Sequence, residues 1–281
     1  MVVSDQQRIV MQTPLTPHHH FADLTKRNVL LYAPVVKTWA SIADVDAYMN
    51  EPQLEPLRMH PSGDLASPSP HRPRYTVFGL LSTRMTRACF EDPQRVCVKL
   101  VDFGEAFVVA SPQVAVARTL HIPPSYAAPE VLLRMPVNLS ADIWALAVLV
   151  HDLVSCGWPL FARVSEVQPD RVLAGIVLRH GRLPNNLWTA WENRSRFFDD
   201  AGAWIGEEKD RPFSSVDDGN IVSVKVSTER CGGVLHPFKQ LVARLTEFDP
   251  ASRASIYEAV ALMQRLWTPD VSAMPVSAAA A

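Results

Sequence analysis

The sequence has 281 residues, of which 48% are hydrophobic and 20% charged, and its 27 Lys and Arg against 29 Asp and Glu give a net charge of −2. This composition is typical of a folded globular chain, and it excludes extensive disorder and the basic surface of most nucleic-acid binders. The longest apolar run, residues 143–150, is too short to cross a membrane, the chain opens on no secretory signal, and its cysteines form no CxxC pair. We therefore expect an intracellular protein, of the cytoplasm and/or the nucleus, that binds neither nucleic acid nor membrane.

Proline is unusually frequent, with 23 Pro against 11 Gly, which predicts long irregular stretches. Residues 33–95 have the character of an insertion, and their proline-rich part is predicted to be an exposed loop. Short elements are expected around and within this insertion: helices over residues 4–12 and 39–49, strands over residues 29–32 and 96–101, and the loop over residues 61–73.

Residues 140–155 form the strongest predicted helix in the chain. Apolar side chains, Leu153 among them, cover nearly every face of it, which indicates a buried helix at the centre of the core. Ser140 is the expected N-cap of this helix. A capping box formed by Ser255 and Glu258 predicts a second helix near the end of the chain.

Three short motifs precede the central helix. They are Phe-Ala-Asp-Leu-Thr-Lys-Arg-Asn at residues 21–28, Asp-Phe-Gly at residues 102–104 and Ala-Pro-Glu-Val-Leu-Leu at residues 128–133. Each motif alone is weak evidence for a particular family. Without the other motifs, Asp23 and Asn28 would be interpreted as an Asx turn. Their order, followed by a buried helix that contains Asp142, resembles the second half of a protein kinase.

The resemblance implies an α+β, mainly α-helical fold: a protein kinase-like large lobe with the small N-terminal lobe missing. On this interpretation the large lobe covers residues 1–267. It carries the insertion at residues 33–95 and a second insertion at about residues 180–235, and residues 268–281 are expected to be a disordered tail.

The resemblance also implies a role for each matched site residue. Asp23 would accept the proton of a substrate hydroxyl, and Asn28 and Asp102 would bind Mg²⁺ at the phosphates of ATP. Leu30 would form the apolar floor under the adenine. The implied activity is ATP-dependent phosphoryl transfer to the serine or threonine hydroxyls of a protein, with ATP and Mg²⁺ as cofactors.

Five further residues would have structural roles in such a fold. Glu130 looks like the family glutamate that pairs with a distant arginine, and Arg253 is the candidate partner. Asp142 would tether the backbone of residues 21–28, although a first-turn carboxylate that favours the helix dipole is the alternative. Phe21 can stack on Phe103.

Several segments narrow the resemblance to the serine/arginine-rich-protein kinase-like proteins of filamentous fungi. They are Trp-Pro-Leu-Phe at residues 158–161, Leu-Pro at 183–184, the tryptophan-containing stretch 188–194 and Phe-Phe-Asp-Asp at 197–200. Acidic residues outnumber basic ones between residues 192 and 218, which would attract a basic peptide substrate, with a solvated surface as the alternative. Trp188 and Trp191 are predicted to be core residues.

The sequence departs from the kinase pattern in two places. Phe21 and Ala22 stand where the family has His and Arg, and Thr25 replaces the usual lysine. The 22 residues before Asp23 contain neither glycine nor lysine, so no phosphate-covering loop and no strand lysine lie there. We therefore expect an incomplete kinase that is inactive alone.

Two alternatives stay open beside the incomplete kinase. The chain would be a lobe-only pseudokinase that acts as a protein-binding module, or it would bind a partner that carries the small lobe. An apolar face near Leu30 and Phe103 predicts a partner that covers it. His18, His19 and His20 are interpreted as a solvated loop, with a metal site as the less favoured reading.

Overall fold

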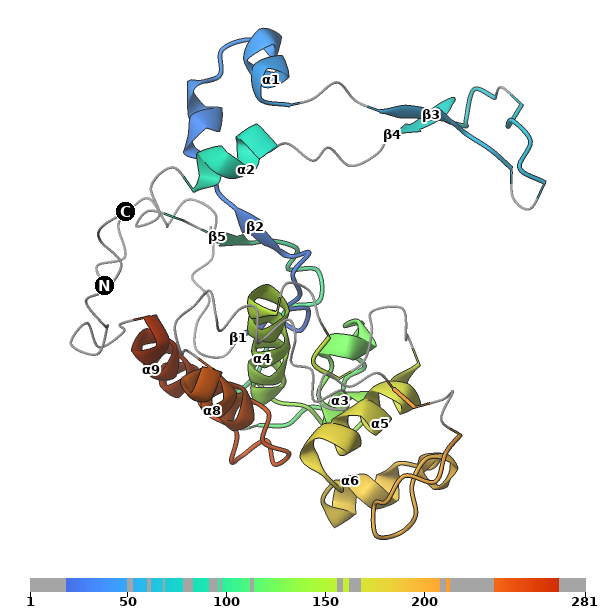
Figure 1. Ribbon diagram of the computed structural model, residues 1–281, viewed down its shortest axis with the longest axis vertical. Helices are drawn as coiled ribbons and strands as arrows, with labels where there is room; N and C mark the ends of the chain where they lie inside the picture. Colours follow the sequence, from blue (N-terminus) through green and yellow to red (C-terminus); the bar gives the residue numbers. More distant parts are fainter. Residues whose placement is uncertain are drawn as a thin grey trace, which may run out of the picture. The chain divides into compact units, whose positions relative to one another are not determined.

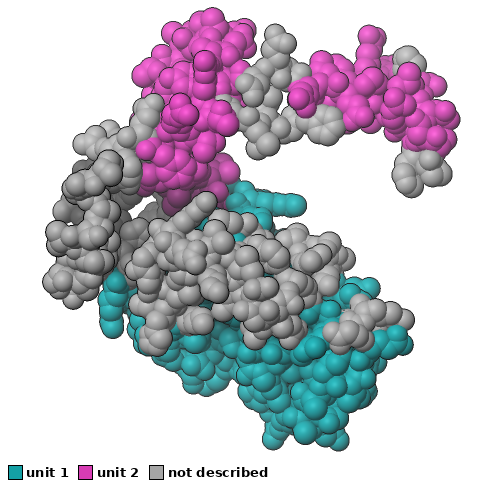
Figure 2. Space-filling model, in the orientation of Figure 1, with its two compact units in different colours: residues 1–28, 101–281 teal, residues 29–100 magenta. Residues whose placement is uncertain are grey.

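The structure is a computed structural model, and the described residues are 19–49, 53–59, 62–67, 69–77, 83–90, 96, 98–111, 114–155, 159–161, 168–207, 211–212 and 235–267. The chain divides into two compact units. Unit 1 comprises residues 1–28 and 101–281, and unit 2 comprises residues 29–100 (Figure 2). Residues 4–12 and 268–281, for which a helix and a disordered tail were predicted, lie outside the described residues.

Unit 1 is mainly helical (Figure 1). Its described helices are η4 (Pro124–Tyr126), α3 (Pro129–Leu132), α4 (Ser140–Val154), α5 (Pro169–His180), α6 (Asn185–Ala190), η5 (Arg194–Arg196), α8 (Leu235–Leu245) and α9 (Ile256–Trp267). Two short antiparallel strands, β1 (His19–His20) and β6 (Phe107–Val108), pair in the register His20↔Phe107. The mixed helix and strand content agrees with the predicted fold class.

Helix α4 is the centre of the core, as its apolar pattern predicted. It contacts α8 and η4, and Trp144 is fully buried with its ring stacked 5.2 Å from that of Phe161. Gly175 of α5 allows the close approach to this layer, because a Cβ there would collide with the Phe161 carbonyl.

Two details predicted for α4 are wrong. Leu139 is the N-cap, and Ser140 is the first helical residue, with its N–H and hydroxyl both donating to Asn138 Oδ1. Leu153 is 64% exposed instead of buried. When nearly every position of a helix is apolar, periodicity does not distinguish the face that lacks a packing partner.

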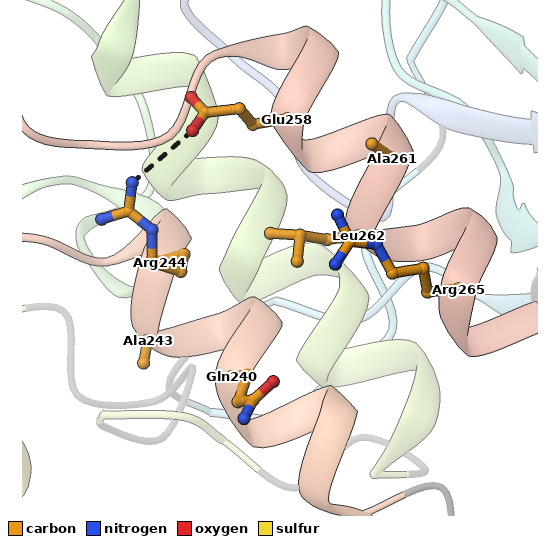
Figure 3. A pocket seen from close by; sticks show the side chains of 7 residues that line it. All are labelled: Gln240, Ala243, Arg244, Glu258, Ala261, Leu262 and Arg265. Atoms are coloured by element: carbon orange, nitrogen blue, oxygen red, sulfur yellow. Dashed lines mark ion pairs between the residues drawn. The ribbon is translucent and has the colours of Figure 1, made fainter.

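Helices α8 and α9 pack against each other, and their facing surfaces leave a groove (Figure 3). The capping box that opens α9 is present: the Ser255 N–H donates to Glu258 Oε2 over 2.8 Å, and the Glu258 N–H donates to Ser255 Oγ over 3.2 Å. The pair satisfies N–H groups that would otherwise have no partner at the start of the helix, as predicted.

An aromatic cluster follows α5. Trp188 and Trp191 are buried, as predicted, and their rings contact Phe198, which packs on Trp204. The indole N–H of Trp191 donates to Asp170 Oδ1 over 2.7 Å, so the cluster is tied to the first turn of α5.

Unit 2 is built from short elements. They are β2 (Val29–Leu31), η2 (Pro34–Thr38), α1 (Ile42–Tyr48), β3 (Leu54–Pro56), β4 (Tyr75–Val77), α2 (Thr83–Cys89) and β5 (Val98–Leu100). Strand β2 pairs antiparallel with β5, and β3 with β4. Strands β2 and β5 and helix α1 confirm the elements predicted at residues 29–32, 96–101 and 39–49, with shorter bounds. Leu30, Leu31 and Val98 are exposed on the β2–β5 ribbon.

The prediction of a solvated histidine loop is wrong for His19 and His20. His19 and His20 form β1, and His20 is fully buried with its ring stacked 4.8 Å from that of Phe107. Pairing with β6 brings an aromatic neighbour from a distant part of the chain, which local composition does not reveal. His18 lies outside the described residues.

Candidate active site

Residues 21–28, here called the catalytic loop, fold around Asp23. The Asn28 N–H donates to the Thr25 carbonyl over 3.0 Å, which closes a tight turn with Lys26 and Arg27 at its tip. The side-chain nitrogen of Asn28 then donates back to Asp23, over 3.0 Å to the carbonyl and 2.8 Å to carboxylate Oδ2. The spacing of five residues between Asp23 and Asn28 thus lets one amide hold both backbone and carboxylate.

The pKa of the Asp23 carboxyl is raised above its ordinary value. Burial is the largest cause, the hydrogen bond from Asn28 opposes it, and the negative charges of Asp102 and Glu105 raise the pKa further. Within the described residues, Asp23 Oδ1 is buried and has no hydrogen-bond partner. A carboxylate with one oxygen held and the other unsatisfied is poised to accept a proton.

Asp102 and Phe103 follow strand β5 and approach the catalytic loop. Asp102 has a left-handed backbone (φ 62°), a conformation that Asp tolerates better than most residues, and its Oδ1 accepts the Gly104 N–H over 3.3 Å. The Phe103 ring meets Phe21 edge to face, with ring centroids 5.1 Å apart, so the predicted aromatic contact is confirmed. The Asp102 residue is exposed.

The side chains near Asp23 are chemically suited to Mg²⁺. The Asn28 nitrogen donates to Asp23, so the amide oxygen is the atom that could serve as a ligand, and Asp102 offers an exposed carboxylate. Such hard oxygen donors, few in number, are what Mg²⁺ uses when it is shared with phosphates and water. Among the described residues no three His, Cys, Asp or Glu side chains gather into a site that would hold a metal without further ligands.

Asp142 holds the start of the catalytic loop, as predicted. From the first turn of α4 its two oxygens accept the Phe21 N–H over 2.7 Å and the Ala22 N–H over 2.9 Å. Ala22 has a left-handed backbone (φ 65°), which is costly for a residue with a Cβ, and these two hydrogen bonds oppose that cost. His20 Nδ1 lies 3.1 Å from Asp142 Oδ2 on the buried side.

Replacing Asp142 with asparagine is expected to loosen this end of the loop. The amide has only one acceptor oxygen, so one backbone N–H loses its partner, at a cost of about 1–3 kcal/mol. Chemical denaturation should show this loss, and hydrogen exchange of the Phe21 and Ala22 amides should accelerate. Asp46→Asn, at an exposed position of α1, is the control and should change neither quantity. Equal exchange in the two variants would contradict the tether.

Glu130 and Arg253 form the buried ion pair that the sequence predicted. Arg253 Nη1 lies 2.8 Å from Glu130 Oε1 and Nη2 lies 3.2 Å from Oε2, and the two side chains are 0% and 4% exposed. The same guanidinium donates to the carbonyls of Ser140 and Glu247. Arg253 therefore joins α3, the start of α4 and the segment before α9.

A second charged cluster was missed by the sequence reasoning. Lys26 Nζ lies 3.0 Å from Asp152 Oδ2, and the Tyr126 hydroxyl donates to the same oxygen over 2.7 Å. Burial and then Asp152 raise the pKa of Tyr126 far above its ordinary value. The signal that would have found this cluster is Asp152 itself, a buried carboxylate in the last turn of a mostly apolar helix.

Leu30 lies in unit 2 and is 49% exposed. Its predicted role under the adenine therefore stays a prediction. The groove between α8 and α9 is lined by none of the predicted site residues; its lining is Gln240, Ala243, Arg244, Glu258, Ala261, Leu262 and Arg265 (Figure 3). Across the described residues, no helix has the length and apolarity that a membrane crossing needs.

The matching family model and the similar known proteins described below agree with one another. The family model described as protein kinase domain matches residues 89–267. The chain is 40% identical over 81 residues to the human serine/threonine-protein kinase DCLK2, which covers 28% of this chain and 10% of that protein. It is 34% identical over 109 residues to homeodomain-interacting protein kinase 1 of Caenorhabditis elegans, which covers 38% of this chain and 12% of that protein.

A third relative is serine/threonine-protein kinase GL21140 of Drosophila persimilis, which is 34% identical over 97 residues, or 34% of this chain and 12% of that protein. The chain thus spans about a tenth of the length of these curated relatives.

Proposed function

Because this chain belongs to the protein kinase domain family, we propose that it carries the catalytic loop and the metal-binding aspartate of a serine/threonine protein kinase. The reaction would be transfer of the terminal phosphoryl group of ATP to a protein hydroxyl. The observation that supports this best is the arrangement of Asp23, which is held by Asn28 and lies within electrostatic reach of Asp102.

Each residue of this arrangement has a distinct task in the proposed reaction. Asp23 accepts the proton of the attacking hydroxyl, and its raised pKa makes it a better base than an ordinary aspartate. Asn28 orients the Asp23 carboxylate, and Asn28 and Asp102 would hold Mg²⁺, which neutralises charge on the transferred phosphoryl group when bound. Leu30 would lie under the adenine.

We propose a basic peptide as the substrate. Four exposed carboxylates, those of Glu192, Asp199, Asp200 and Glu207, support this proposal, since they outnumber the two arginines of the same segment, Arg194 and Arg196, and an excess of negative charge attracts a basic peptide. The aromatic stretch that contains Trp188, Trp191 and Phe198 supports membership of the serine/arginine-rich-protein kinase-like group of filamentous fungi. The widely spaced cysteines, of which Cys89 is a free buried thiol, support an intracellular location.

We further propose that the polypeptide of residues 1–281 does not transfer phosphate by itself. A kinase positions the phosphates with a glycine-rich loop and a strand lysine. The residues before Asp23 contain neither glycine nor lysine, so residues 1–22 supply neither of these two elements. The phosphates of ATP would then lack the loop that covers them and the lysine that binds them.

A lobe-only module that binds a partner is the second candidate. The observation that favours it is the β2–β5 ribbon, on which Leu30, Leu31 and Val98 are 49%, 44% and 59% exposed. Apolar side chains gathered on one ribbon favour a covering partner. A partner that carries the small lobe would reconcile both candidates.

Manganese binding, read by electron paramagnetic resonance, tests the metal site, since Mn²⁺ takes the same oxygen ligands as Mg²⁺. We expect the 1–281 polypeptide to bind Mn²⁺ in the millimolar range, and Asp102→Asn to weaken binding about tenfold. The control Asp46→Asn should bind like the wild type. Equal binding by both variants would argue against the site.

A transfer assay with labelled ATP and an arginine-rich peptide tests the proposed lack of activity. We expect no incorporation above that of Asp23→Asn. Robust transfer that Asp23→Asn abolishes would overturn the proposed inactivity and would support the proposed role of Asp23.

A further inference from the structure

The tip of the catalytic loop is held by an ion pair. Lys26 is at the tip of the turn that the Asn28 N–H closes on Thr25, and its ammonium lies 3.0 Å from Asp152 Oδ2. The Lys26 side chain is 46% exposed, whereas that of Asp152 is only 8% exposed. The pair therefore differs from an ordinary surface ion pair, because its anion is taken almost fully out of water.

The carboxylate that pairs with Lys26 also has a second, uncharged partner. The buried Tyr126 hydroxyl donates to the same oxygen of Asp152 over 2.7 Å. Tyr126 ends η4, two residues before the Ala-Pro-Glu motif, and η4 packs on α4. A neutral donor alone leaves the charge of Asp152 unbalanced, and Lys26 balances it.

Helix α4 thus contacts the catalytic loop through two carboxylates. Asp142 accepts the backbone N–H groups of Phe21 and Ala22 at the start of the loop, and Asp152 receives Lys26 at its tip. The two carboxylates are separated by ten residues of one helix, or about 15 Å along its axis. Asp23 lies between these two contacts along the chain, and Asn28 follows the second contact by two residues.

We propose that Lys26 is a positioning residue, which acts through Asp152 to hold the turn of residues 25–28 so that Asn28 faces Asp23 and the cation. This role rests on the proposed function. Thr25, which stands at the position of the family lysine, is buried and carries no charge. Lys26, one residue later, supplies a positive charge instead, and its partner is the carboxylate of Asp152 in helix α4.

The proposal is tested first without any ligand. Lys26→Met keeps the aliphatic stem and removes the charge, and we expect exchange of the Asn28 amide to accelerate about tenfold. Lys26→Arg should stay within about twofold of the wild type, because it keeps the charge. Arg27→Met, at the neighbouring exposed residue of the same turn, is the matched control and should leave this amide unchanged. Equal exchange in Lys26→Met and Arg27→Met would overturn the proposal.

Asp152→Asn supplies a second variant that keeps an acceptor for the Tyr126 hydroxyl. We expect it to accelerate exchange of the Asn28 amide as Lys26→Met does, and the double variant to add nothing, since both changes break one interaction. Additive effects would overturn the pairing of these two residues.

Mn²⁺ binding then separates positioning from simple stabilisation. Lys26→Met should weaken Mn²⁺ binding about fivefold, and Lys26→Arg should restore it. Unchanged binding beside accelerated exchange would overturn the positioning role, because Lys26 would then only stabilise the loop. If the wild type binds no Mn²⁺, the proposed metal site fails, while the exchange comparison still decides whether Lys26 holds the turn.

Discussion

Replacing Arg253 with methionine is expected to lower the free energy of unfolding by about 3–5 kcal/mol, because it leaves the Glu130 carboxylate buried without a partner. The exposed fractions of the two side chains, 0% and 4%, show that water does not replace the lost guanidinium. The Ser140 and Glu247 carbonyls lose a donor in the same variant. Methionine matches the length of the aliphatic stem, so the effect measures the charged head and not a cavity.

Thermal unfolding checks this expectation, and a decrease of the melting temperature on the order of 10 °C should result. Arg244→Met is the matched control. Arg244 is 44% exposed and pairs with Glu247 over 3.4 Å and with Glu258 over 3.7 Å, the second pair being the dashed line in Figure 3. Exposed pairs of this kind contribute less than about 1 kcal/mol. Similar losses in the two variants would show that burial of the Arg253 pair does not matter.

Acidification from pH 7 to pH 5 is expected to destabilise the protein through His180. The ring lies among Trp144, Phe161 and Phe248, and its Nε2 is buried with no hydrogen-bond partner within the described residues. Burial, and then the positive charge of Arg179, lower the pKa of His180 from 6.5 to about 4. The folded protein therefore keeps this ring neutral at a pH where the unfolded chain protonates it.

The sign of the effect follows from proton binding. Between pH 6.5 and about 4 the unfolded state binds the proton and the folded state does not, so stability falls as the pH falls across this window. The expected loss is about 2 kcal/mol at pH 5 and about 3 kcal/mol below pH 4. The lowered pKa values of Asp44, Asp249 and Glu258 act only below their ordinary values of 3.8 to 4.5, outside most of this window.

Urea unfolding at pH 7 and pH 5 measures the loss. His180→Phe keeps an aromatic ring in the cluster and removes the titrating group, so its stability should change much less between the two pH values. His71→Gln replaces an exposed histidine of unit 2 and should retain the pH dependence of the wild type. A wild-type stability that does not fall at pH 5 would contradict the assignment to His180.

Much of the candidate site could be predicted from the sequence. The order of the three motifs located Asp23, Asn28 and Asp102, and the later arginine located the partner of Glu130. The Glu130–Arg253 pair is confirmed, whereas the roles of Asp23, Asn28 and Asp102 stay predictions. Short motifs are informative because they encode local geometry: the spacing from Asp23 to Asn28 is that of one closed turn. The capping box at Ser255 succeeded for the same reason.

Other parts of the site depend on residues that meet only in the folded chain. Nothing near Lys26 in the sequence points to Asp152, which is more than a hundred residues away, and nothing near His20 points to its burial on Phe107. Strand pairing and helix packing produce both contacts. Local composition therefore predicted a solvated histidine loop where the fold buries one ring.

The sequence by itself determined the protein kinase motifs and the central helix, and it supplied the candidates for a proton acceptor and for cation ligands, because each depends on neighbours within a few turns of chain. Only the tertiary structure decided which charges became buried, that Leu153 faces solvent and that α4 holds the catalytic loop at both Asp142 and Asp152. Burial and ion pairing depend on distant residues that close packing brings within a few ångströms of one another, and such proximity is a property of the fold.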